Sequence, residues 1–413
     1  MSYTKFCAGL SVLATSFTAR ILLVISLASA ASAGEAGSLR TGAEQPEVYL
    51  PLLEGQQIGL VVNQTSRAGD QHLIDFLRTR DVAVAKIFAL EHGVRGNVEN
   101  GGKVDDGIDG PSGLPIVSLY GGQYAPREES LQDIDWLVFD IQDVGVRFYT
   151  YISSLHYLMQ ACADFDVPLL VLDRPNPNGD YVDGPVLEPA FRSFVGMHPI
   201  PLVHGMTVGE LAQMINGEGW LKSGARCDLT VIPVSGYHHQ QMYSLPVRPS
   251  PNLPNDISIR RYPTLGLFEG TTVSIGRGTD FPFQAVGHPA DSRGKFTFTP
   301  HPVPGASENP KHNGTRLTGD DLRSAGKGGM AGIRFSLAPL LDWYGRSGES
   351  GEDFFVRAGF FDKLAGTDRL RRAILAGESA EQIRASWQPD LEAFRERRKP
   401  YLLYPDIPVR PGE

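Results

Sequence analysis

The sequence lacks several features that mark common protein classes. It has only three cysteines in 413 residues, too few for a disulfide framework or a four-thiolate zinc site. Acidic residues outnumber basic ones by 47 to 38, and the formal net charge of −9 argues against charge-driven binding to nucleic acid. The composition, 41% hydrophobic and 21% charged, is that of a globular protein with a large core.

Several catalytic signatures are absent as well. The sequence has no G-x-S-x-G nucleophile elbow, no Walker loop and no H-E-x-x-H zinc motif. Gly276-Arg277-Gly278 lacks the third glycine and the following helix of a dinucleotide fingerprint. The histidines are scattered, and the adjacent pair His238-His239 does not have the spacing of a helical metal site. We therefore expect neither a metal nor a cofactor, and chemistry based on carboxylates remains.

The N-terminal segment has the composition of an export signal. Lys5 and Arg20 provide a basic flank, residues 21–28 form a short apolar run, and Ala31-Ser32-Ala33 is a small-residue cleavage site. A buried core helix is the alternative interpretation. We predict a signal peptide over residues 1–33, secretion across the inner membrane and a periplasmic location. No later segment has the length and apolarity of a membrane span, so we expect none in the mature chain.

From residue 57 onward, short apolar runs alternate with helical stretches. We expect strands at 57–62, 82–89, 115–119, 135–139 and 168–172, with helices near 70–79 and 149–165. Near-continuous apolar strands that alternate with helices favour a mostly parallel sheet covered on both faces. The predicted fold class is therefore α/β.

The second half of the chain has a less regular pattern. Thr207 to Asn216 is predicted as a helix, because Glu210 stands three residues after the N-cap Thr207. We further expect a loop or boundary at 246–263, a strand at 270–275, an exposed excursion at 300–329, and helices near 336–345, 367–376 and 379–398.

Polar side chains follow the predicted strands at the point where each strand ends. Right-handed crossovers place the carboxyl ends of parallel strands at one edge of the sheet, where open α/β sheets bind ligands. Loops at strand ends are commonly polar, so any one of these residues has a purely structural alternative. Together they predict a polar cleft suited to a hydroxyl-rich ligand. The residues are Asn63, Gln64, Glu91, His92, Arg95, Tyr120, Asp140, Gln142, Asp143, Asp173 and Arg174.

Glu91 is the first candidate for a catalytic acid. Glycosidic hydrolysis needs a protonated acid at the leaving oxygen and a second group that activates water or stabilises the sugar cation. Glu91 follows a buried strand, where burial raises the pKa of a carboxyl group. A salt bridge between Glu91 and Arg95 is the structural alternative.

The second catalytic group stays open at this point. Asp140, Asp143 and Asp173 stand at neighbouring strand ends and are candidates. Tyr149 is another, because tyrosine serves as the nucleophile in some glycosidases. An ion pair between Asp173 and Arg174 is the structural alternative for that aspartate.

Eight runs of residues form a distinctive series along the chain. They are LEHGVRG at 90–96, DIQDVGVRFYTY at 140–151, LDRPNP at 172–177, HGMT at 204–207, LFEGT at 267–271, GRGT at 276–279, FFDKL at 360–364 and RRKPYLLY at 397–404. This series resembles the NamZ-like exo-β-N-acetylmuramidases over about residues 50–405.

The resemblance implies an exo-acting hydrolase that removes N-acetylmuramic acid from the non-reducing end of peptidoglycan fragments, with Glu91 as the catalytic acid. It also implies a Rossmann-like N-terminal domain, placed at 45–235, and a smaller α+β C-terminal domain at 236–413, with the active site between them. The partners would be muramic acid–glucosamine saccharides and muropeptides. A periplasmic sugar-binding protein without turnover is the alternative function.

The lactyl carboxylate of N-acetylmuramic acid requires a cation, and Arg95, Arg147 and Arg277 are candidates for bidentate binding. Retention, inversion and participation of the substrate's acetamido group all stay open. The other predicted substrate-binding residues are Asn63, Gln64, His92, Gln142, Tyr151, Arg174, Asn176, His204 and Glu269.

Overall fold

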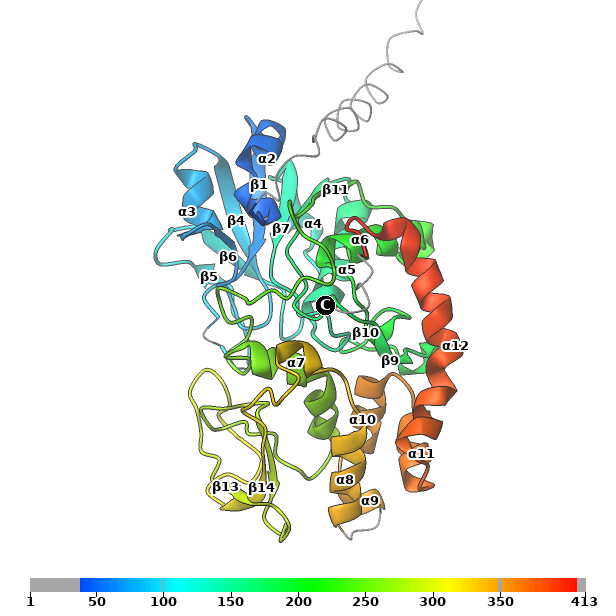
Figure 1. Ribbon diagram of the computed structural model, residues 1–413. Helices are drawn as coiled ribbons and strands as arrows, with labels where there is room; N and C mark the ends of the chain where they lie inside the picture. Colours follow the sequence, from blue (N-terminus) through cyan, green and yellow to red (C-terminus); the bar gives the residue numbers. More distant parts are fainter. Residues whose placement is uncertain (1–37, 97, 100, 348–350, 407–413) are drawn as a thin grey trace, which may run out of the picture. The chain divides into compact units, whose positions relative to one another are not determined.

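The first half of the described chain forms a seven-stranded sheet (Figure 1). The computed structural model describes residues 38–96, 98–99, 101–347 and 351–406. The strand order is β11-β8-β7-β1-β4-β6-β5, and neighbouring strands are parallel except β5, which is antiparallel to β6. In sheet order the strands are β11 Leu229–Ile232, β8 Leu169–Leu172, β7 Trp136–Asp140, β1 Gln57–Val62, β4 Ala83–Ala89, β6 Pro115–Ser118 and β5 Gly107–Ile108.

This arrangement confirms the predicted α/β class and all five predicted strands, with ends that shift by a residue at most. The parallel strands β1, β4, β6, β7 and β8 end at one edge, as expected. The edge strands β11 and β5 were not predicted. β5 has only two residues, and β11, Leu-Thr-Val-Ile, has only four residues in a part of the chain without a regular pattern.

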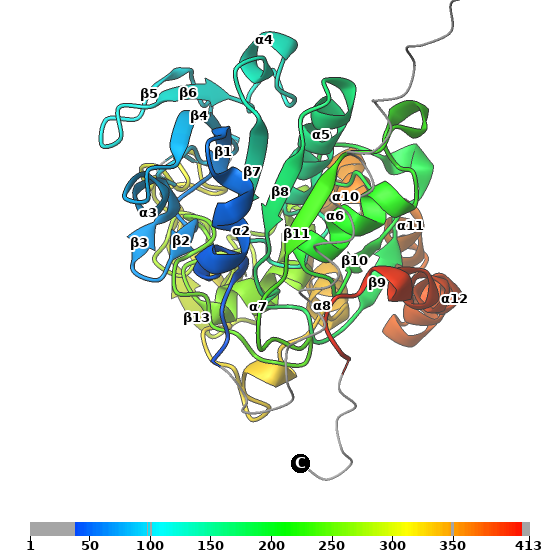
Figure 2. The same ribbon diagram turned by 90° about the horizontal axis from the view of Figure 1, so that it is seen from above.

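Both faces of the sheet are covered, and alternate residues of a strand point to different layers. Val61 packs with residues of α5 and α6, whereas Leu60 and Val62 pack with residues of α2 and α3. Figure 2 shows these helices on the two sides of the strands. The helices are α2 Pro46–Leu53, α3 Leu73–Arg78, α4 Glu128–Leu131, α5 Tyr151–Asp164, α6 Val208–Gly217, α7 Asp256–Leu265, α8 Ala338–Ser347, α9 Gly351–Phe354, α10 Ala358–Ala365, α11 Arg369–Leu375 and α12 Ala380–Arg398.

The predicted capping of α6 is present, because the Thr207 hydroxyl accepts a hydrogen bond from the Glu210 N–H and the Glu210 carboxylate accepts one from the Thr207 N–H. One other prediction was wrong, because residues 270–275 form no strand beyond a single bridge at Ser274. Two more are correct only in part. Residues 246–255 form the expected loop, but 256–263 belong to α7, which Asn255 caps although Pro263 lies inside the helix. The stretch 300–329 is largely exposed or half-buried, but it contains the central strand β14.

Smaller sheets and 3-10 turns complete the fold. A three-stranded antiparallel sheet, β12-β14-β13, joins α7 to α8, and two strand pairs stand apart from it. The short strands are β2 Arg67–Ala68, β3 Gln71–His72, β9 Asp183–Val186, β10 Pro201–Val203, β12 Ala285–His288, β13 Phe296–Phe298 and β14 Leu317–Asp321. The 3-10 helices are η2 Gly42–Glu44, η3 Pro189–Phe191, η4 Lys222–Gly224, η5 Gly266–Gly270, η6 Met330–Gly332 and η7 Lys399–Tyr401.

Residues from Leu39 onward belong to one compact unit. Cys162 and Cys227 are buried in it as free thiols. Within the described ranges, no helix combines the length and apolarity that crossing a bilayer requires. The predicted signal peptide, residues 1–33, lies outside the described residues.

Candidate active site

A cavity of about 280 Å³ lies at the edge where the parallel strands end. Its lining combines the loops after β4 and β6 and the start of α5 with segments of the C-terminal half that run from residue 250 to α10. Its polar and charged lining residues are Glu91, His92, Tyr120, Tyr149, Thr150, Ser250, Asn252, Tyr262, Glu269, Arg277 and Arg357. The apolar remainder is Phe148, Phe194, Val195, Leu253, Gly266, Phe283, Phe360 and Leu364.

Glu91 lies in this cavity and is only 8% exposed. Its carboxylate accepts hydrogen bonds from the Tyr120 hydroxyl (2.8 Å, at Oε1) and the Thr150 hydroxyl (2.5 Å, at Oε2). The Gly101 N–H is a third donor, 3.2 Å from Oε1. Two of the three partners are hydroxyl groups, which can accept as well as donate. The surroundings therefore accommodate both the ionised and the protonated carboxyl group.

The turn after β4 aims Glu91 into the cavity because its backbone has unusual dihedrals. His92 has φ +69° and Gly93 φ +72°, a left-handed region that favours glycine and carries a cost for histidine. The His92 ring fixes this turn, since its Nδ1 lies 2.8 Å from the Val98 carbonyl oxygen and its Nε2 3.1 Å from the Ser250 hydroxyl. Burial lowers the pKa of His92, so the ring is neutral, and Nδ1 carries the proton because a carbonyl oxygen only accepts.

Two arginines supply positive charge to the cavity. Arg277 lies over the Phe283 ring, 4.9 Å from its centroid, and donates from Nε to Glu269 at 2.7 Å. Arg357 lies 4.3 Å from the centroid of the Phe360 ring. Among the described residues, no carboxylate forms a salt bridge with Arg357. The terminal guanidinium nitrogens of Arg277 and the whole guanidinium of Arg357 are thus available to an anionic ligand.

The other two predicted cations do not line the cavity. Arg95 forms a bidentate pair with Asp109, at 3.1 and 2.6 Å. The alternative salt bridge between Arg95 and Glu91 is therefore not formed. Arg147 is fully buried and donates to four backbone carbonyls, those of Pro185, Ile200, Leu364 and Ala365, at 2.6–3.0 Å. Burial lowers the pKa of Arg147 to about 9, and the group stays charged at neutral pH.

The three strand-end aspartates also lie outside the cavity lining. Asp140 forms a bidentate pair with Arg174 (2.5 and 2.9 Å). Asp143 accepts the Gly145 N–H at 2.6 Å, and burial raises its pKa to about 7. Asp173 accepts bonds from the N–H of Gly209 and from the hydroxyls of Thr207 and Tyr404, which anchor the start of α6. Burial raises its pKa to about 6.

Tyr149 lines the cavity, but its hydroxyl donates to the Pro249 carbonyl at 2.7 Å, and burial raises its pKa well above the ordinary value. A phenol in that state is a poor nucleophile. Among the described lining residues, Glu269 carries the one other carboxylate that could take the second catalytic role.

Of the predicted binding residues, only His92, Glu269 and Arg277 line the cavity. The other predicted binding residues form hydrogen bonds with protein groups outside the cavity lining. Tyr151 joins Asn63 to the Glu91 carbonyl, and Gln64 donates to the carbonyls of Arg248 and Pro249. Gln142 donates to the carbonyls of Asp143 and Pro175, Arg174 pairs with Asp140, Asn176 donates to the Met206 carbonyl, and His204 accepts from the Met206 N–H.

Several lining residues were not predicted as site residues. Thr150 stands in the DIQDVGVRFYTY run and Phe360 in the FFDKL run, so both had a signal in the sequence. Arg357, Phe194, Ser250 and Asn252 stand in loops without a motif, and only the tertiary fold brings them to Glu91.

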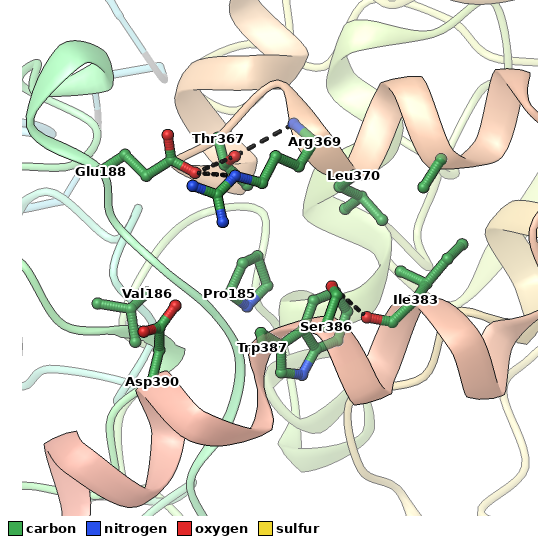
Figure 3. Close-up of a pocket in the computed structure, with 11 residues that line it drawn as sticks. Pro185, Val186, Glu188, Thr367, Arg369, Leu370, Ile383, Ser386, Trp387 and Asp390 are labelled. Carbon is green, nitrogen blue, oxygen red and sulfur yellow. Dashed lines mark hydrogen bonds and ion pairs between the residues drawn. The ribbon is translucent and has the colours of Figure 1, made fainter.

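A second cavity, between β9 and the helices α11 and α12, is shown in Figure 3. It measures only about 30 Å³, the space of a water molecule or two, and cannot hold a sugar. At its rim Glu188 accepts from the Thr367 hydroxyl and pairs with Arg369. In the part of the chain that the structure describes, no three His, Cys, Asp or Glu side chains gather as a metal site would require.

Comparisons with known proteins show which family the chain belongs to. The chain is 39% identical over 373 residues to the peptidoglycan β-N-acetylmuramidase NamZ of Bacillus subtilis (strain 168), covering 86% of this chain and 89% of that protein. Two solved DUF1343 family proteins of Bacteroides fragilis NCTC 9343 have similar structures. One is 47% identical, with a TM-score of 0.83 over 90% of this chain and 100% of that one. The other is 29% identical, with a TM-score of 0.75 over 89% and 99%.

Two family descriptions match consecutive parts of the sequence. The N-terminal part of the exo-beta-N-acetylmuramidase NamZ family matches residues 58–257, and its C-terminal part matches residues 260–404. The expected resemblance is thereby confirmed: this chain belongs to the exo-β-N-acetylmuramidase NamZ family.

Proposed function

We propose that this chain is a glycosidase that releases N-acetylmuramic acid from the non-reducing end of peptidoglycan fragments. The observation that carries the proposal is the position of Glu91, a buried carboxyl group in the cavity at the sheet edge, between two hydroxyl partners. The activity of the Bacillus subtilis relative supports a hydrolase over a binding protein without turnover.

In this proposal Glu91 protonates the glycosidic oxygen as the bond to the leaving sugar breaks. The proton leaves one carboxyl oxygen, and the hydroxyl groups of Tyr120 and Thr150, which donate to Glu91, stabilise the carboxylate that forms. The Gly101 N–H, already aimed at Oε1, stabilises the same charge. The site therefore needs no large rearrangement during proton transfer.

The second role falls to Glu269 or to the substrate's own acetamido group. Glu269 is the other carboxylate among the described lining residues, and its hydrogen bond with Arg277 orients it. If Glu269 activates water, the first-formed sugar has inverted configuration. If the acetamido oxygen attacks the anomeric carbon, configuration is retained. Proton NMR of the first-formed anomer separates the two routes.

We assign recognition of the lactyl carboxylate to Arg277 and Arg357. Both line the cavity, and each keeps guanidinium N–H groups free for a carboxylate. Arg277→Ala or Arg357→Ala should reduce the preference for muramic acid over glucosamine substrates by about 1.5–3 kcal/mol, the value of a charge-assisted hydrogen bond. Arg95→Ala is the matched control, because Arg95 pairs with Asp109 away from the lining. An unchanged preference in both cavity variants would exclude the assignment.

The role of Glu91 is tested by Glu91→Gln, with turnover of a muramic acid–glucosamine disaccharide followed by mass spectrometry. The variant should lose activity by about 10²–10⁴-fold, the usual contribution of a general acid. Glu54→Gln, at an exposed position outside the cavity, is the matched control and should keep full activity. Comparable turnover by the two variants would refute the proposal.

We propose the domain division at 45–235 and 236–413, with the cavity between the two, and secretion to the periplasm. The two consecutive family matches, to residues 58–257 and 260–404, support a chain of two parts, and they meet C-terminal to the boundary proposed here. Glu91 and Tyr149 come from the first part and Glu269 and Arg277 from the second. The composition of residues 1–33 supports export. The mass of the protein recovered from cell fractions would show whether cleavage occurs after Ala33.

A further inference from the structure

Four aromatic rings form a continuous group beside Glu91, which we call the aromatic platform. Its members are Tyr120, Tyr124, Tyr157 and Phe194. Tyr124 stacks on Phe194 at 4.3 Å between centroids and on Tyr157 at 5.8 Å, with interplanar angles of 28° and 21°. Tyr120 meets the edge of Tyr124 at 6.2 Å. Three separate elements contribute these rings: the loop after β6, α5 and the loop after η3.

The platform is continuous with the cavity and extends beyond it. Tyr120 and Phe194 belong to the cavity lining, whereas Tyr124 and Tyr157 do not. All four side chains are partly exposed, so the group reaches the surface of the protein next to the cavity. The exposed parts of large aromatic side chains beside a cavity offer contact area to a ligand.

The position of Glu91 indicates which ligand the aromatic platform would contact. The Tyr120 hydroxyl bonds to the Glu91 carboxylate, so the platform begins at the proposed proton donor. A general acid lies beside the oxygen of the leaving group, and the sugar that leaves must therefore extend from Glu91. We propose, on the basis of the function proposed above, that the aromatic platform is the subsite for the leaving saccharide. The glucosamine residue next to the scissile bond would stack one face of its ring on Phe194, which lines the cavity and is itself stacked on Tyr124.

A pyranose ring and an aromatic platform are chemically complementary. A pyranose ring exposes C–H groups on its faces and hydroxyl groups at its rim, and an aromatic ring buries the former while leaving the latter to water. The platform carries no charged residue among its four members, whereas Arg277 and Arg357, which we assign to the lactyl carboxylate, supply the positive charge of the same cavity. This division lets one site hold an anionic sugar and a neutral one in a defined order.

The test compares two substrates that differ only in the leaving group. One is the muramic acid–glucosamine disaccharide, and the other is the methyl β-glycoside of N-acetylmuramic acid, which cannot reach the platform. Tyr124→Ala should lower kcat/KM for the disaccharide about tenfold, the effect of one lost aromatic contact. The methyl glycoside should be hydrolysed within about twofold of the wild-type rate, which also shows that the variant is folded.

Tyr124→Phe is the matched control. It keeps the ring, and the described structure gives the Tyr124 hydroxyl no hydrogen bond, so it should behave as the wild type on both substrates. Tyr157→Ala, which removes the other ring stacked on Tyr124, should lower kcat/KM for the disaccharide in the same direction.

Each other outcome overturns the inference. An equal loss on both substrates would show that Tyr124 only supports Tyr120 and Glu91. An unchanged disaccharide rate would show that the leaving sugar lies elsewhere. Failure of the wild type to release muramic acid from either substrate would instead refute the proposed function.

Discussion

Arg147→Lys tests whether Arg147 stabilises the fold or binds the substrate carboxylate. Sequence alone makes Arg147 and Arg277 equivalent candidates for the substrate carboxylate. In the structure Arg147 is buried under the cavity floor, and its two terminal nitrogens each serve two carbonyls. Nη1 donates to Pro185 and Ile200, and Nη2 donates to Leu364 and Ala365 at the end of α10. Arg147 therefore ties β9 and the start of β10 to a helix of the C-terminal half.

Lysine keeps the charge but replaces the planar fork with one nitrogen. A single ammonium group cannot reach both pairs of carbonyls, so at least two buried acceptors lose their donors. Each unsatisfied buried acceptor costs about 1–3 kcal/mol, which gives a loss of about 2–6 kcal/mol in the free energy of unfolding. The unfolding entropy is about 0.8 kcal/mol/K for a unit of about 375 residues, and the melting temperature should fall by about 3–7 °C.

The melting temperature is measured by calorimetry, together with the muramic acid preference of the folded variant. Arg369→Lys, at an exposed helix position, is the matched control and should leave the melting temperature unchanged. The folded Arg147→Lys protein should keep its preference for muramic acid. A variant with unchanged stability and a lost preference would show that Arg147 binds substrate and that the carbonyl contacts are not its role.

Two further predictions concern pH. Burial alone would lower the pKa of His239, but hydrogen bonds with Asp406 and Glu210 raise it to about 9. Its folded pKa lies above the unfolded one, so this stabilisation is complete below pH about 6.5 and is lost as the pH rises through about 9. His239→Gln should flatten the melting temperature over that range. Burial raises the pKa of Asp143 to about 7, so ionisation of Asp143 destabilises the fold as the pH rises from about 4 to 7. Asp143→Asn should gain stability relative to the wild type across that window. Melting temperatures that depend on pH in the same way in the variant and the wild type would contradict this.

The sheet could be predicted from the sequence because its signals are local. Apolar runs such as 57–62 and the capping residues Thr207 and Glu210 act over a few neighbouring positions, and their effect does not depend on the rest of the chain. The same locality explains the failures. The prolines and asparagines around α7 indicated a loop, whereas packing against η5 holds a helix there. The strand β14 has a polar sequence and is held by its two neighbours.

The sequence by itself determined the family, the order of the elements and the presence of Glu91 at the end of a buried strand. It named Glu91 as the first candidate for the acid but left the second catalytic group open among Asp140, Asp143, Asp173 and Tyr149. The tertiary structure shows how the surroundings of these carboxylates differ: the aspartates find donors inside the protein, and Glu91 meets Tyr120 and Thr150 at a cavity. The partner of a charged side chain is set by segments that are distant in the chain, and only the folded protein brings those segments together.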